Sequence, residues 1–232
     1  HTMGIDGFLG GKYKMNLTEA SIYKRFWLNN SWGKLDFYIS AGAQWDKVPF
    51  PLLIMPKVNL SWFAQPGTYT FQLMNNMEFL NDRYAMWHVS WDLNGKIFNR
   101  IPLLKHLKWR EYISFRGMYG KLTDKNNPWK NSGDAMLYEF PEGSYPISPS
   151  KPYMEVAVGV RNIFKIFGVD YVRRINYHEH PGTKKNGVRV VICTVLRYTQ
   201  VFNHLKEIID SGRLGDVMAI NHEECVGNVH QS

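Results

Sequence analysis

Cysteine is scarce in this chain, and long apolar runs are absent from it. The two cysteines, Cys193 and Cys225, lie in the last forty of 232 residues. No run of 18 apolar residues occurs, which excludes membrane-spanning helices. A mean hydropathy of −0.34 with 44% hydrophobic residues excludes a disordered chain. The hydropathy and composition do not exclude a membrane β-barrel, because each of its strands needs only one apolar face over about 9–11 residues.

An export signal is not expected at the start of this sequence. The start, His1 to Ile5, has neither the basic nor the apolar region that an export signal requires. We therefore expect either that processing removed the signal or that the sequence is an internal fragment of a longer protein.

Composition changes near residue 190. Residues 1–192 hold all eight tryptophans and 32 aromatic side chains, whereas residues 193–232 hold two aromatics, Tyr198 and Phe202. The first part carries 25 basic and 15 acidic side chains, and the second carries 3 and 5. The basic residues are scattered, which argues against nucleic-acid binding and favours solvated loops or contact with lipopolysaccharide phosphates. We expect two segments of unrelated origin, residues 1–190 and 191–232.

Before residue 190 the dominant period is two, the period of a strand with one apolar and one polar face. Every second residue is apolar from Leu35 to Trp45, and the pattern recurs at 85–93 and 154–160. Weaker patterns predict strands at 21–28, 69–74, 109–119, 169–177 and 187–192. The eleven residues from Leu35 to Trp45 suit a tilted membrane strand, although a soluble β-sandwich or lipocalin-like barrel has similar composition.

The connections are rich in turn residues. Asn29–Gly33 and Asn94-Gly95 predict compact hairpins, and longer polar loops are expected at 123–134 and 138–152. A short helix or turn is expected at Ile101–Lys105. Alternation of tight and long connections is typical of a barrel with two unlike ends.

Several motifs before residue 190 resemble those of one family. They are Phe98–Glu111 (FNRIPLLKHLKWRE), Met77–Tyr84 (MEFLNDRY), Pro152–Lys165, Val169–Arg174 and Lys185–Arg189. Over residues 5–190 the chain resembles an uncharacterised Gram-negative outer-membrane family, a domain of unknown function. Its full-length members join a carboxypeptidase-like regulatory domain to a C-terminal β-barrel.

The resemblance implies an incomplete transmembrane β-barrel with a structural or transport-related role. It implies an outer-membrane location, contact with lipid and lipopolysaccharide, and recognition by the outer-membrane assembly machinery. Such barrels end at an outward-facing aromatic residue, whereas this chain continues through Ile192-Cys193. The regulatory domain and the earlier strands are also expected to be missing, which would leave unpaired edges.

The last forty residues follow a strand–helix–strand pattern. Val190–Leu196 is a continuous apolar run, Val201 to Ile209 has helical spacing, and Asp216–His222 predicts a strand. Through Leu196–Thr199 and Leu205–Asp216, residues 191–232 resemble a fragment of the Gfo/Idh/MocA oxidoreductases, whose relatives include NAD-dependent glycosidases. That resemblance implies a substrate-side role for His230. The chain lacks a G-x-G-x-x-G motif after a strand and the family's catalytic lysine, so we expect no cofactor and no oxidoreductase activity.

Other candidate groups have simpler explanations. The His178-Glu179-His180 motif could ligate a metal but is more consistent with a polar loop, and His222–Cys225 is a weak zinc pattern. Cys193 lies in an apolar run, where a thiol is usually inert. The carboxylates Asp36, Glu111 and Glu155 are expected to face inward and pair with arginines such as Arg110 and Arg161.

The sequence thus predicts a mainly β protein. We expect an antiparallel transmembrane β-barrel fragment at residues 1–190 and a short α/β, strand–helix–strand tail at 191–232. Catalytic, cofactor and metal residues are not expected. A soluble β-rich binding module and an inactive oxidoreductase fragment are the alternatives.

Overall fold

The computed structural model describes residues 2–4, 14–29, 32–64, 69–192, 207–208 and 211. The chain divides into two compact units, His1–Cys193 and Thr194–Ser232. In the second unit, Glu207 and Ile208 are helical. The rest of the predicted strand–helix–strand tail, with Cys193, the His222–Cys225 pattern and His230, lies outside the described residues.

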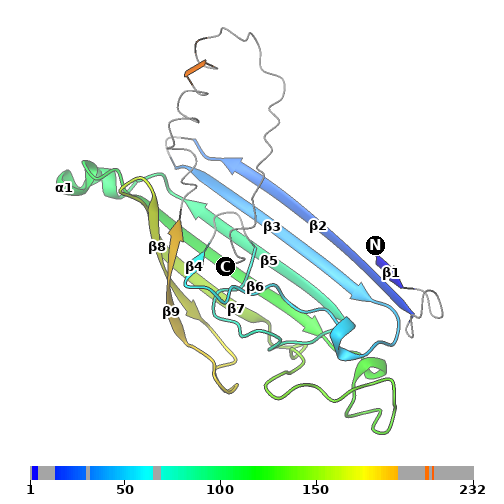
Figure 1. Ribbon diagram of the computed structural model, residues 1–232. Helices are drawn as coiled ribbons and strands as arrows, with labels where there is room; N and C mark the ends of the chain where they lie inside the picture. The colour runs from blue at the N-terminus through cyan, green and yellow to red at the C-terminus, as the bar shows by residue number, and fades with distance from the viewer. Residues whose placement is uncertain are drawn as a thin grey trace, which may run out of the picture. The chain divides into compact units, whose positions relative to one another are not determined.

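In the described residues, the first unit forms one nine-stranded sheet (Figure 1). Its strands are β1 (Thr2–Gly4), β2 (Met15–Trp27), β3 (Lys34–Gln44), β4 (Phe63–Ala64), β5 (Arg83–Asp92), β6 (Arg110–Lys121), β7 (Tyr153–Ile163), β8 (Phe167–Arg174) and β9 (Asn186–Ile192). Their order is β1-β2-β3-β5-β6-β7-β8-β9-β4. Neighbouring strands are antiparallel, except that β4 joins β9 in parallel at one edge.

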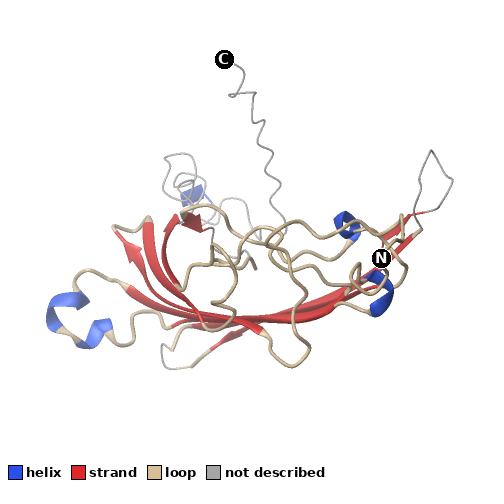
Figure 2. Ribbon diagram, turned by 90° about the horizontal axis from the view of Figure 1, so that it is seen from below, coloured by secondary structure: helices blue, strands red, loops and turns tan. Residues whose placement is uncertain are grey.

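The sheet is curled into a half-barrel, with the long connections gathered on its concave side (Figure 2). In the described part of the first unit, helical structure is limited to short turns at η2 (Phe50–Leu52), η3 (Phe98–Arg100), η4 (Asp124–Asn126) and α1 (Pro102–Lys105). The predicted mainly β class and the predicted short helix at 101–105 are therefore confirmed. In the part of the chain that the structure describes, no helix is long and apolar enough to cross a membrane.

The convex face, here called the outer face, is apolar and exposed. Register places Ile39 beside Trp87, Val89 beside Phe115, and Val158 beside Tyr171. Exposed fractions on this face include 72% for Ile22, 54% for Ile39 and 56% for Val158. Strand alternation thus sends the apolar residues away from the interior, the reverse of a water-soluble sheet with one covered face.

The concave face, here called the inner face, is polar and buried. Its buried side chains include Ser40, Gln44, His88, Ser114, Arg116, Glu155, Asp170 and Arg174. These residues occupy the positions between the apolar ones, as the period-two pattern predicts. The inner face is covered by the protein's own connections, of which residues 45–82 (the inserted segment) and 122–152 are the longest.

The connections differ at the two ends of the strands. One end carries the turns after β2 and β7 and the 93–109 connection, and the other carries the connections 45–82, 122–152 and 175–185. The predicted hairpin at Asn29–Gly33 joins β2 to β3, as expected. Asn94 and Gly95 do form a turn with positive φ, but the prediction of a compact hairpin is wrong because η3 and α1 follow before β6.

The predicted strand at 69–74 is also wrong. Phe71 makes one isolated bridge to Val58, and its side chain packs against Tyr153 with ring centroids 5.3 Å apart. Phe71, Met74 and Phe79 form a core with Met118, Ile147 and Tyr177 on the inner side of the sheet. The aromatic pattern in this segment thus reflects a small core beneath the sheet. The segment does not pair as a strand, because the backbone amides of Gln72 and Leu73 donate to the Glu155 side chain on β7.

Candidate functional site

The inner face is held to the inserted segment by Glu155, which lies on β7 and is 1% exposed. Its Oε2 accepts a hydrogen bond from the Gln72 amide at 2.8 Å, and its Oε1 accepts one from the Leu73 amide at 2.8 Å. The Tyr153 hydroxyl donates to Oε1 at 2.6 Å. A buried carboxylate with three donors is well satisfied, so this group fixes the segment against the sheet.

Two arginines complete this cluster. Arg116, opposite Glu155 in the register, places Nη1 3.8 Å from its Oε2 and donates from Nε to His88 Nε2 at 3.2 Å. From β9, the Arg189 guanidinium donates to the Gln72 carbonyl. The positive charges of Arg116 and Arg189 offset the buried carboxylate, which would otherwise be costly to remove from water.

A second cluster joins the end of the inserted segment to β8. Arg174 makes a two-point ion pair with Glu78, with Nη1–Oε2 3.0 Å and Nη2–Oε1 2.5 Å. His180 places Nδ1 2.9 Å from Glu78 Oε1 and stacks on Tyr145 with ring centroids 4.2 Å apart. The Arg174 guanidinium also donates to the Tyr177 carbonyl at 2.7 Å. This cluster therefore ties the connections 45–82, 122–152 and 175–185 together.

Tyr177 lies at the edge of this second cluster. Its hydroxyl accepts from the Ser148 amide at 3.1 Å and donates to the Lys151 carbonyl. Burial is the main cause that raises the pKa of Tyr177, and the negative charge of Glu179 adds to it. The neutral phenol is therefore the form that the fold stabilises.

The predicted carboxylate pairs are only partly as expected. Asp36 does face inward, but its partner is Arg25 at 2.6 Å. Glu155 faces inward against Arg116. Arg161 instead pairs with Asp170, at 2.5 and 2.8 Å. The pairing depends on cross-strand register, which alternation within one strand does not reveal.

Glu111 departs from the prediction as well. It lies at the start of β6 on the same side as Ile113 and Phe115, so it does not share the inner face with Glu155. Its Oε1 accepts from the amides of Ile97 and Phe98, at 3.1 and 2.5 Å. Glu111 thus holds the 93–109 connection.

The residues of the His178-Glu179-His180 motif have separate surroundings. His180 contacts Glu78, whereas Glu179 pairs with Lys151 at 3.3 Å. All three lie in the connection between β8 and β9. Among the residues described, no group of three or more His, Cys, Asp or Glu side chains could hold a metal ion.

Most residues of the two clusters were not singled out by the sequence. Glu78, His88, Arg116, Arg174 and Arg189 come from four strands and one connection. One signal was present: in β6, Arg116 stands at an inward position between the outward residues Phe115 and Gly117, neither of which is polar. Chemically, these groups are engaged with one another and with backbone, which suits a fixed interior.

Residues 1–129 match a family model described as the C-terminal domain of a family of unknown function, DUF5686. The chain belongs to this family. No curated protein and no solved structure matches the chain. The predicted likeness to a domain of unknown function is thereby confirmed over residues 1–129, whereas it was expected to reach residue 190. The Gfo/Idh/MocA likeness of residues 191–232 stays a prediction.

The DUF5686 match ends in the 122–152 connection, but the sheet does not. β6 lies inside the matched residues, and its neighbour β7 lies outside them. Nine pairs of residues, from Arg110–Arg161 to Met118–Tyr153, join these two strands without a break in register. Residues beyond the match are therefore part of the same folded sheet.

Proposed function

We propose that residues 1–192 form a section of an outer-membrane β-barrel wall, with the outer face against lipid and the inner face against the protein's own connections. The observation that carries this proposal is the exposed apolar outer face opposite a buried, charged inner face. A water-soluble domain rarely exposes a contiguous apolar surface of this kind. A lipid-facing barrel wall requires it, because its outward residues form an apolar band.

The dimensions of the outer face support this role. On β3 the apolar positions run from Leu35 to Ala43, a length of about 26 Å at 3.3 Å per residue. Outward positions of the neighbouring strand β5 between Ala85 and Trp91 are apolar too. Charged residues of the outer face on β5, β6 and β8 stand at strand ends: Arg83, Glu111, Lys121 and Arg173. Aromatic and charged residues at the ends of an apolar band are typical of membrane interfaces.

The filled interior favours a structural or gated role over an open pore. The inserted segment covers the inner face through Glu155 and Arg189, and the Glu78–Arg174 pair fixes its end. In this proposal the protein is not an enzyme. A complete barrel would need further strands beside β2, whose pairing with β1 covers only Met15, Asn16 and Leu17 in the described residues.

The test is to measure whether the outer face meets lipid. Val158→Cys and Ser132→Cys are made with Cys193 and Cys225 replaced by serine, and each is labelled with an environment-sensitive fluorophore. In bilayers containing spin-labelled lipid, the label at Val158 is expected to shift to shorter wavelength and be quenched. The label at Ser132, an exposed position in the 122–152 connection, should remain in water. Water exposure at both sites, with monodisperse protein in the absence of detergent, would show a soluble module instead.

A further inference from the structure

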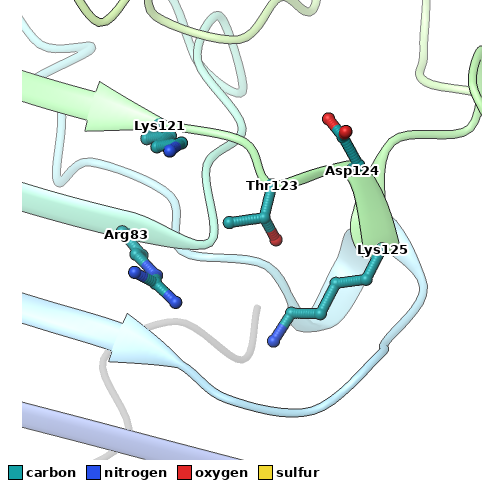
Figure 3. A pocket seen from close by; sticks show the side chains of 5 residues that line it. All are labelled: Arg83, Lys121, Thr123, Asp124 and Lys125. Carbon is teal, nitrogen blue, oxygen red and sulfur yellow. The ribbon is translucent and has the colours of Figure 1, made fainter.

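An open pocket of about 420 Å³ lies at the ends of β5 and β6, where the 122–152 connection begins (Figure 3). Its lining comprises Arg83, Lys121, Thr123, Asp124 and Lys125. Three of these five side chains are cationic. The pocket is separate from the two clusters of the inner face, whose residues do not line it.

The positive charge of the pocket is not balanced by ion pairs in the described part of the chain. Arg83 and Lys121 stand directly opposite each other in the register, an arrangement that repels. Asp124 pairs with Lys130 at 2.8 Å, and Figure 3 shows its carboxylate pointing away from Arg83. Among the residues that the structure describes, no carboxylate forms an ion pair with the three cations of the pocket.

Two of the three cations, Arg83 and Lys125, are also held in place. The Arg83 guanidinium lies 5.5 Å from the centre of the Trp45 ring, within range of a cation–π contact. The Lys125 ammonium donates to the carbonyls of Gln44 and Trp45 at the end of β3. Figure 3 shows the Arg83 and Lys125 side chains extending toward one another. Cations fixed before an anion arrives lose less conformational entropy on binding it.

The location of the pocket indicates which anion it takes. Arg83 and Lys121 occupy outer-face positions, two residues beyond Ala85 and Tyr119 respectively. The Tyr119 side chain is 48% exposed and the Trp45 side chain 52% exposed. An anion in this pocket would therefore have the apolar band immediately beside it. A lipid with a phosphate headgroup matches both surfaces: its phosphate can enter the cationic pocket, and its acyl chains can lie along the apolar outer face.

From this geometry we infer that Arg83, Lys121 and Lys125 bind the phosphate of an anionic membrane lipid at the end of the apolar band. The inference rests on the proposed membrane position of the outer face. The arginine supplies paired N–H donors and the lysines supply point charges, a combination suited to phosphate oxygens. Lipid binding would also relieve the repulsion between Arg83 and Lys121.

The experiment titrates the full chain, in a non-ionic detergent, with phosphatidic acid, with phosphatidylcholine of the same chain length, and with inorganic phosphate, using calorimetry. We expect the unaltered protein to prefer phosphatidic acid. Arg83→Gln combined with Lys121→Gln should weaken that binding at least about tenfold, since two charge-assisted contacts are lost. The matched control, Arg100→Gln with Lys105→Gln, removes two exposed cations from the 93–109 connection at the other end and should bind normally.

Two further measurements make the result decisive. The charge-preserving exchange, Arg83→Lys with Lys121→Arg, should keep most of the binding, and its thermal unfolding should match that of the unaltered protein, since both charges remain. Unchanged affinity in the glutamine variant contradicts the inference, and so does inorganic phosphate binding as tightly as the lipid. If the label at Val158 is quenched by lipid while the glutamine variant binds normally, the pocket inference alone fails. Water exposure at Val158 removes the membrane proposal itself.

Discussion

Glu78 and Arg174 lie 96 residues apart in the chain, and they form a two-point ion pair whose side chains are 1% and 0% exposed. The pair joins the inserted segment to β8. Each ion has a further partner: the His180 ring contacts the Glu78 carboxylate, and the Arg174 guanidinium donates to the Tyr177 carbonyl. Buried pairs of this kind are weak evidence for stability as such, but removal of one partner leaves the other charge isolated.

Glu78→Gln is therefore expected to lower the free energy of unfolding by about 3–5 kcal/mol, because Arg174 remains buried without its counter-charge. Urea titration, followed by tryptophan fluorescence, measures the change. The control is Lys130→Gln, which breaks the exposed Asp124–Lys130 pair and should cost less than about 1 kcal/mol. Equal stability of the two variants would show that the buried pair does not fix the inserted segment.

Glu155→Gln tests the anchor of the inserted segment. The amide side chain keeps one acceptor oxygen, so the Gln72 and Leu73 amides and the Tyr153 hydroxyl can no longer all be satisfied. We expect faster proteolytic cleavage within residues 45–82 than in the unaltered protein, mapped by mass spectrometry. Glu139→Gln, at an exposed position, serves as control. Cleavage confined to other connections would contradict the anchoring role.

The raised pKa of Tyr177 leads us to expect that the stability of the fold depends on pH. Burial raises its pKa in the folded state above the unfolded value of about 10, so the folded protein binds the phenolic proton more tightly. The stabilisation is complete below pH 10 and is lost as the pH rises through the folded pKa. Because other tyrosines titrate too, the measurement is the difference between the unaltered protein and Tyr177→Phe across pH 9 to 12. The difference should shrink with rising pH, and a constant difference would contradict the prediction.

We expect a side chain at position 117, in place of Gly117, to disturb packing on the outer face. It is the register partner of Trp87, and a Cβ added to it would lie 2.0 Å from an atom of that ring. Gly117→Ala should push the indole aside and cost about 1–3 kcal/mol, measured by thermal unfolding. Trp87→Leu in the same chain should recover part of that loss. Additive losses in the double variant would show that the two positions are independent.

The sequence predicted strand positions best where apolar and polar residues alternate along a single strand. Alternation from Leu35 to Trp45 and from Ala85 to Leu93 predicts β3 and β5 to within two residues at each end. The start of β2 was missed because Asn16, Thr18 and Glu19 interrupt the apolar pattern. The partners of Asp36 and Glu155 could not be predicted, since each depends on the register between strands and on the path of a long connection.

The anchoring of the inserted segment has a consequence for the order of folding. Residues 45–82 leave β3 early in the chain, but the groups that fix them, Glu155, Arg174 and Arg189, arrive with β7, β8 and β9. Contacts so distant in sequence form late, because the intervening chain must first be closed. We therefore expect Gln72, Leu73 and Glu78 to become fixed only when the last three strands pair, so that completion of the sheet and closure of its interior form one cooperative step.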